Sequence, residues 1–247
     1  MLKFSKANTK LKQLHDVEEL KYWLENKRKV YSLDLLSGYS CPAAKECLSK
    51  VVQIDGKRKI KDGLKTEFRC FSASQEVLFP GVYNRRKHNY DTLRGWHLND
   101  MIHRLNQDKP KDLGILRFHV GGDFFNSDYF FAALSLAMMH PDQLFYAYTK
   151  SLRYWIKHRE WTDQIPNFVL TASRGGRDDH LITEHVLRES VVVFSEDEAY
   201  ERALEIDHND SHAAVPDWEY NDFALLIHGT QPKGTEAAEA LKLLRKN

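Results

Sequence analysis

The chain of 247 residues contains three cysteines, Cys41, Cys47 and Cys70, and all of them lie in one short stretch. A buried cysteine behaves as a small hydrophobic residue and is expected inside apolar strands and helices. These cysteines instead stand among charged residues such as Lys45 and Arg69. Thiolates that share a metal explain this placement better, so we expect the three cysteines to form a metal site.

The residues leave three alternatives for these thiols. Iron–sulfur clusters are held by cysteine thiolates, and three cysteines leave one iron of a [4Fe-4S] cluster open for an exogenous ligand. A structural zinc site needs four ligands, and His88 or His97 is a candidate for the fourth. In the third alternative the thiols are unligated. Five residues separate the first two cysteines and 22 separate the last two, which is no regular finger spacing and favours the cluster.

Polar residues follow two apolar runs in the middle of the chain. His119 and Asp123 flank a Gly121-Gly122 pair, and Lys150 follows the next run. In parallel α/β folds the carboxyl ends of the strands face the active site. Lys150 can meet a carboxylate or phosphate. His119 is either a hydrogen-bonded core histidine or a substrate contact, and Asp123 is the better candidate for substrate contact. We therefore assign Asp123, His119 and Lys150 as candidate catalytic residues.

The segment SRGGRD, which begins at Ser173, combines two glycines with two arginines before an expected helix. Backbone amides and guanidinium groups in that arrangement suit an anionic ligand. A plain helix entry capped by Asp178 or Asp179 explains the same residues and stays open. The candidate cofactor-binding residues of this segment are Ser173, Arg174 and Arg177.

Six short apolar runs alternate with stretches of helical length and predict a parallel sheet, because parallel strands need crossover connections. The fold class expected is α/β, a partial (β/α)6 TIM-like barrel with the cysteine-bearing loop after its first strand. The runs are Tyr31–Leu36, Gly114–Val120, Leu144–Tyr148, Asn167–Thr171, Val191–Phe194 and Phe223–Ile227.

The organisation expected is a single domain over residues 1–247. Apolar residues at spacings of three and four predict a helix over residues 10–29, within an N-terminal helical extension of residues 1–30. Residues 50–67 are basic, contain two Asp-Gly turn signals and predict an exposed hairpin inserted in the cluster loop. A helix is expected over residues 92–106 after a basic loop at 85–88, and a last helix at the end of the chain.

Composition limits the partners. Lys plus Arg number 36 and Asp plus Glu number 35, which gives a formal net charge of +1. A net charge this small does not indicate binding to nucleic acid or to an anionic membrane through the overall charge of the protein. Binding to nucleic acid or protein then has to be local, through the basic insertion. The longest apolar run is too short for a membrane span, and the first residues lack the apolar segment of a secretory signal. We expect no membrane partner and a cytoplasmic location.

Several segments resemble the phage gene-product-88-like family of three-cysteine proteins, which implies the host cytoplasm as the location. The matching segments are SCPAAKEC, RCFSAS, NRRKHN, RFHVGGDFF, FYAYTKS and SRGGRDD, which span residues 40–179.

The arrangement of these segments also resembles the radical S-adenosylmethionine superfamily, with a cluster loop after the first strand and a Gly-Gly-acidic motif after the second. The resemblance implies that S-adenosylmethionine binds the open iron. It also implies that Gly121, Gly122 and Asp123 hold the methionine end of the nucleotide. Typical members have a compact C-x3-C-x2-C loop and Glu in place of Asp123, and both features differ here.

Three functions follow as hypotheses. The first is an iron–sulfur protein that binds a [4Fe-4S] cluster through its cysteines and acts as a radical S-adenosylmethionine-type enzyme on an unknown substrate. The second keeps the cluster in a non-catalytic redox or structural module that binds nucleic acid or protein. The third is a zinc-dependent hydrolase with His119 and Asp123 near the metal.

Overall fold

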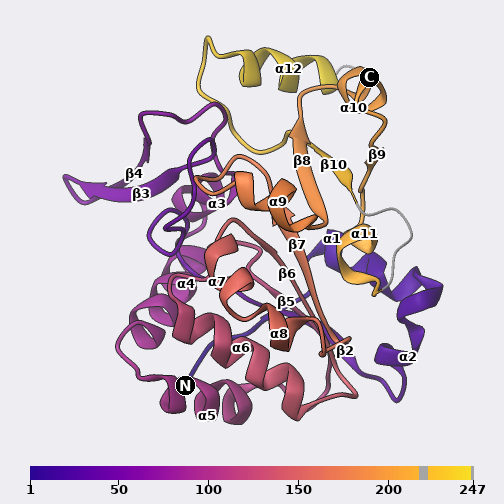
Figure 1. The fold of residues 1–247 in the computed structure, drawn as a ribbon. Helices are drawn as coiled ribbons and strands as arrows, with labels where there is room; N and C mark the ends of the chain where they lie inside the picture. Colours follow the sequence, from indigo (N-terminus) through magenta and orange to yellow (C-terminus); the bar gives the residue numbers. More distant parts are fainter. Residues whose placement is uncertain (217–221, 246–247) are drawn as a thin grey trace.

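An eight-stranded sheet forms the centre of the computed structural model, which describes residues 1–216 and 222–245 (Figure 1). Every neighbouring pair of strands is parallel except the first, in which β1 runs antiparallel to β2. In spatial order the strands are β1 (Ser5–Lys6), β2 (Lys29–Leu33), β5 (Leu113–Phe118), β6 (Leu144–Thr149), β7 (Phe168–Ser173), β8 (Glu189–Val193), β10 (Phe223–Leu226) and β9 (Glu205–Ile206).

The six apolar runs of the sequence are the strands β2, β5, β6, β7, β8 and β10, so their prediction is confirmed. From β2 to β10 their spatial order follows their order along the chain. The strands β1 and β9 form the two edges, and over the described residues the sheet does not close into a barrel. The fold is therefore α/β with a large, mostly parallel sheet.

One face of the sheet packs against helices that follow the strands. Successive side chains of a strand point to opposite faces, and Leu116, Phe118 and Phe145 belong to the core on this side. Figure 1 shows the helices α5 to α8 gathered there. The helices of this part of the chain are α5 (Leu98–Asp108), α6 (Ser127–Met139), α7 (Leu152–Lys157), α8 (Arg159–Thr162) and α9 (His180–His185).

The opposite face is covered by the N-terminal segment and by α11 (Ser211–Ala214), which share a second core with it. The predicted helix over residues 10–29 is wrong, because four short pieces replace it. Val17 has an extended backbone that bends the segment along the sheet, and Lys29 already begins β2. The pieces are α1 (Thr9–Lys12), the 3-10 turns η1 (Gln13–Asp16) and η2 (Glu18–Leu20), and α2 (Lys21–Leu24).

Two helices follow the last cysteine, α3 (Phe71–Leu78) and α4 (Pro80–Leu93). The basic run at 85–88 lies inside α4, so its prediction as a loop is wrong. Pro80 occupies the first turn of α4, where its fixed backbone angle favours a helix start. The helix predicted over residues 92–106 is correspondingly divided between the end of α4 and α5, with a break after Leu93.

The basic insertion forms the predicted hairpin, a separate two-stranded ribbon of β3 (Ser49–Ile54) and β4 (Lys57–Asp62). Asp55 and Gly56 join the strands with positive φ angles of 51° and 72°, as a tight hairpin turn requires. Figure 1 shows the ribbon projecting from the body of the molecule. The C-terminal part adds α10 (Glu196–Glu201) and α12 (Glu236–Leu244). None of the described helices combines the length and the apolar character that crossing a membrane requires.

Candidate functional site

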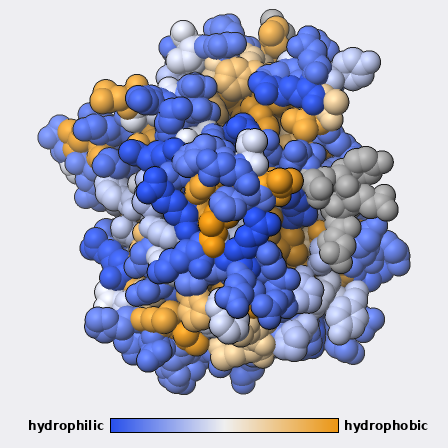
Figure 2. All heavy atoms as spheres, in the orientation of Figure 1, coloured by the Kyte–Doolittle hydropathy of each residue, from blue (hydrophilic) through white to orange (hydrophobic). Residues whose placement is uncertain are grey.

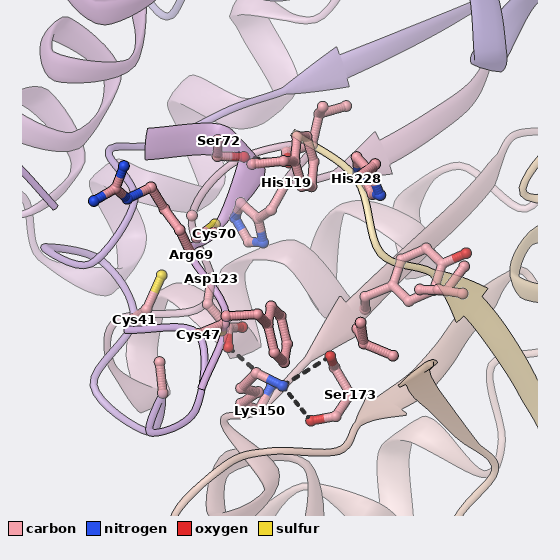
Figure 3. Close-up of a pocket in the computed structure, with 18 of the residues that line it drawn as sticks. Cys41, Cys47, Arg69, Cys70, Ser72, His119, Asp123, Lys150, Ser173 and His228 are labelled. Carbon is pink, nitrogen blue, oxygen red and sulfur yellow. Dashed lines mark hydrogen bonds between the residues drawn. The ribbon is translucent and has the colours of Figure 1, made fainter. Parts of the chain in front are cut away.

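A cavity of about 160 Å³ lies between the cysteine loop (residues 34–70) and the carboxyl ends of the parallel strands (Figure 3). One ordered water needs about 10–15 Å³ of such space, so the cavity accommodates a group much larger than a single metal ion. Among the site residues predicted from the sequence, those that line it are Cys41, Cys47, Cys70, His119, Gly122, Asp123, Lys150 and Ser173.

The three cysteines reach this cavity from distant parts of the loop. Cys41 and Cys47 lie before β3, whereas Cys70 is the residue that caps the start of α3. Burial raises the pKa of all three thiols, that of Cys70 to about 11, and neighbouring thiols raise the pKa of Cys41 and Cys70 further. The free thiols are therefore protonated near neutral pH, and a metal has to displace these protons when it binds.

The described part of the chain has no group of three or more His, Cys, Asp or Glu side chains gathered closely enough to hold one metal ion. The two histidines considered as a fourth zinc ligand lie elsewhere. His88 makes a hydrogen bond through Nε2 to the carbonyl oxygen of Met1, and His97 precedes α5. The thiols therefore share a cavity without the arrangement of a single-ion site.

Asp123 lies opposite the cysteines and is held by its own neighbours. Its Oδ1 accepts hydrogen bonds from Thr149 Oγ1 and the amide of Phe124, both at 2.7 Å, and its Oδ2 accepts one from the amide of Lys150 at 2.9 Å. Burial nevertheless raises the pKa of Asp123 to about 6. The carboxyl group is thus fixed in orientation, and Oδ2 keeps capacity for a further donor.

His119 follows the end of β5 in a left-handed conformation with a φ of 68°. Its Nε2 makes a hydrogen bond to the hydroxyl of Tyr129 at 3.0 Å, and its buried Nδ1 has no hydrogen-bond partner among the described residues. Burial, together with the charge of Arg117, lowers the pKa of His119 to about 3. The imidazole is therefore neutral at physiological pH and presents no positive charge to the cavity.

Lys150 joins two strand ends across the bottom of the cavity, as the dashed lines in Figure 3 show. Its Nζ donates to the carbonyl oxygen and the hydroxyl of Ser173 at 2.8 and 3.0 Å, and also to the carbonyl oxygen of Arg174. The side chain is buried, with 7% of its surface exposed. Lys150 therefore brings one positive charge close to the thiols, and this charge lowers the pKa of Cys47 against the effect of burial.

Two of the predicted cofactor contacts point away from the cavity. Arg174 makes a two-pronged ion pair with Glu189 of β8, and Arg177 is exposed. The amides of Gly175 and Gly176 both donate to the carboxylate of Asp179 at 2.9 Å. An internal carboxylate thus occupies the anion position that the sequence suggested for a ligand.

The segment around these glycines clamps the cysteine loop instead. Ala44 and Gly176 form an isolated antiparallel bridge between the loop and the end of β7. The amide of Glu46 donates to the carbonyl of Gly175 at 3.0 Å, and the amide of Arg177 donates to the carbonyl of Ala43 at 2.8 Å. These backbone contacts hold the part of the loop between Cys41 and Cys47 against the sheet.

A buried ion pair, which the sequence did not reveal, supports the start of the loop. Arg86 of α4 and Glu76 of α3 lie 3.1 Å apart, with 3% and 0% of their side chains exposed. Glu76 also accepts hydrogen bonds from the amide and the hydroxyl of Ser37 at 3.0 and 2.8 Å. A Cβ atom at Gly121 would lie 2.5 Å from the Arg86 guanidinium carbon, so a larger residue there would displace the guanidinium group from Glu76.

Gly122 and Ser40 connect the loop with the strand end. The amide of Asp123 donates to Ser40 Oγ, which itself donates to the carbonyl of Leu36 at 2.7 Å. Gly122 has a φ of 96°, and a Cβ there would lie 2.6 Å from Ser40 Oγ. Gly121 and Gly122 therefore allow the close approach between β5 and the cysteine loop, and of the two only Gly122 lines the cavity.

The inner end of the cavity has a polar floor that the sequence analysis missed. Arg117 lies over the ring of Tyr148 at 4.8 Å and forms an ion pair with Asp210. Asp210 also accepts hydrogen bonds from Lys10 at 2.8 Å and from Tyr146 at 3.0 Å. Arg117 precedes His119 by two positions, so strand alternation identifies it, whereas nothing in the sequence indicates Asp210.

We expect Arg86→Ala to destabilise the protein by about 3–5 kcal/mol, because the charge of Glu76 then stays buried without its partner. Arg85→Ala is the matched control, since Arg85 is its exposed neighbour on the same helix. Its effect should stay within about 0.5 kcal/mol. Urea unfolding of both variants checks this, and equal midpoints for the two would contradict the role assigned to the ion pair.

The lowered pKa of His119 predicts a dependence of stability on pH. The unfolded chain binds a proton at this imidazole below its ordinary pKa of 6.5, whereas the folded chain does not until pH falls to about 3. The contribution of His119 to the free energy of unfolding is therefore complete above pH 6.5. It decreases as the pH falls, by roughly 2 kcal/mol at about pH 5.

His119→Asn removes this titration and keeps a residue that tolerates a positive φ. The free energy of unfolding, measured in urea at about pH 7.5 and about pH 5, should fall more steeply in the wild type than in the variant. Parallel pH profiles of the two proteins would show that His119 is not neutral in the folded state.

Almost the whole chain matches a single family model, described as Gene product 88, over residues 2–246. No curated protein and no solved structure matches the chain. The match includes the cysteine loop, the strand ends that line the cavity and the ion pair that supports them. The chain belongs to the Gene product 88 family.

Proposed function

We propose that this protein binds a [4Fe-4S] cluster through Cys41, Cys47 and Cys70. The observation that supports it is the convergence of all three thiols on one cavity from positions separated by the whole β3–β4 ribbon. Buried cysteines that only fill space have no reason to share one cavity with charged strand ends. Such a site requires reduced thiols, which places the protein in a reducing compartment, the host cytoplasm.

The spread of the thiols favours a cluster over a single zinc ion. A cluster distributes its thiolates over different iron atoms, whereas a zinc ion holds every ligand at roughly 2.0–2.3 Å. Cys47 raises the pKa of both Cys41 and Cys70, so the thiols lie near one another, and neither His88 nor His97 lines the cavity as a fourth zinc ligand would. Three ligands leave one iron free, and the cavity lies on the side of the loop where a further ligand has room.

We also propose S-adenosylmethionine as the ligand of that free iron, and an open partial barrel as the surrounding fold. The order of the six strands β2, β5, β6, β7, β8 and β10 supports the barrel, because each of them pairs in parallel with the next of the six along the chain. A cluster of this kind supplies the electron for reductive cleavage of the bound nucleotide.

The residues of the chain would position this ligand. Asp123 Oδ2 lies on the wall facing the cysteines and can accept a hydrogen bond from an ammonium group, as the methionine end of the nucleotide carries. Lys150 fixes the neighbouring strand ends and balances the negative charge of the thiolates. His119 stays neutral beside them and adds no competing charge.

Anaerobic reconstitution with iron and sulfide tests the first proposal. We expect about four iron and four sulfide per chain in the wild type, as a [4Fe-4S] cluster contains. Cys70→Ala removes one of three protein ligands and should lower the iron content by more than about half. Colorimetric counting of iron and sulfide, with the visible absorption spectrum, measures both.

Lys45→Ala is the control for that experiment, because Lys45 belongs to the same loop and has no thiol. It should load as the wild type does. A colourless wild type that retains zinc, or full loading of Cys70→Ala, would overturn the cluster proposal.

Binding of S-adenosylmethionine to the reconstituted protein tests the second proposal. Asp123→Asn keeps the size of the side chain but cannot neutralise an ammonium group, so affinity should fall about tenfold or more. Asp128→Asn, an exposed change of the same kind in α6, should bind like the wild type. Equilibrium dialysis measures the three affinities. Equal affinity of the wild type and Asp123→Asn would remove Asp123 from the site.

A further inference from the structure

We propose that the outer face of the β3–β4 ribbon binds the phosphate backbone of duplex DNA. Residues directly opposite each other in an antiparallel pair share a face. The cross-strand pairs on this face are Lys50 with Lys61, Val52 with Lys59, and Ile54 with Lys57. We call it the lysine face, since four of its six side chains carry an ammonium group.

The other face of the ribbon anchors it to the protein. Val51 is 1% exposed and packs in a small core with Leu36 and Tyr83. Arg58 donates to the carbonyl of Val77 at 3.2 Å and lies over the ring of Tyr83. The ribbon is therefore fixed against α3 and α4, and its lysine face is turned to solvent.

The lysine face has no acidic partner within the part of the chain that the structure describes. None of the recorded ion pairs involves Lys50, Lys57, Lys59 or Lys61. Lys57, Lys59 and Lys61 are exposed, and Lys50 lies directly opposite Lys61, which is a destabilising placement for like charges. A polyanion laid across this face offsets that repulsion and releases counterions from the nucleic acid.

The shape and the chemistry of the face favour duplex DNA over other polyanions. A two-stranded β-ribbon has the dimensions that the major groove of B-DNA admits. Proteins that bind single strands stack successive bases on free aromatic faces. The six side chains of the lysine face include no ring, and Lys50 Nζ already lies over the adjoining ring of Tyr39, 5.2 Å from its centroid. Figure 2 shows the projecting ribbon at the left margin as mainly hydrophilic, with small hydrophobic patches.

Lysines on a short, exposed ribbon also prevent strands from pairing with other chains, so binding has to be measured directly. The probe is a fluorescently labelled duplex of random sequence, titrated with the full chain across a range of salt concentrations. Four phosphate contacts at about 0.9 each predict a slope of about −3.6 for log K against log salt. The measurement works with or without a reconstituted cluster, so its outcome is independent of the proposed function.

The triple variant Lys57→Gln, Lys59→Gln, Lys61→Gln should lose at least about tenfold in affinity at the lowest salt and retain a slope of about −0.9. The matched control is Lys12→Gln, Lys27→Gln, Lys111→Gln, which removes the same charge from exposed positions off the ribbon. It should bind DNA like the wild type. Unchanged circular dichroism in both variants confirms that the fold is intact.

Three outcomes would overturn the proposal. The first is equal affinity of the two triple variants for DNA, which would show that binding depends on the net charge of the protein and not on the lysine face. The second is a wild type that fails to bind the duplex at low salt. The third is tighter binding of a labelled polyglutamate than of DNA, which would make an acidic protein the partner of the lysine face.

Discussion

Glu76 and Arg86 form an ion pair that is almost completely withdrawn from water, and either charge alone at that depth is strongly unfavourable. The pair therefore fixes α3 against α4 and, through the hydrogen bonds to Ser37, the first residues of the cysteine loop. Gly121 lies flat against the guanidinium group, which brings the end of β5 to the same place. This arrangement fixes the start of the cysteine loop beside Asp123, and the bridge between Ala44 and Gly176 fixes the part of the loop between Cys41 and Cys47.

The strands and the ribbon could be predicted from the sequence, because apolar runs and Asp-Gly turns are patterns of residues that are neighbours in the chain. Sequence reasoning located residues whose position depends on the end of their own strand, such as Asp123 and Lys150, which both line the cavity. It did not locate residues whose position depends on partners that are distant in the sequence. In the sequence Arg86 has the pattern of a solvent-exposed charge, but in the fold it forms a buried ion pair with Glu76. Arg174 likewise forms an ion pair with Glu189 on the next strand of the sheet.

The ribbon and the cavity are adjacent in the chain and in space. Ser49 begins β3 two residues after Cys47, and its hydroxyl accepts a hydrogen bond from the amide of Cys70 at 3.3 Å. Asp62 at the end of β4 pairs with Arg69, and Gln231 holds the backbone of Arg69 from the far side. A ligand bound to the ribbon would therefore act on the residues that position Cys47 and Cys70.

Electron paramagnetic resonance of the reduced, reconstituted protein, recorded before and after addition of S-adenosylmethionine, tests the central claim most directly. We predict the signal of a reduced [4Fe-4S] cluster and a change in that signal on addition of the nucleotide, because the proposed cluster would present its iron without a cysteine ligand to the cavity. A signal that stays unchanged on addition of the nucleotide would contradict an open iron facing the cavity. A protein with no iron-dependent signal would contradict the cluster itself.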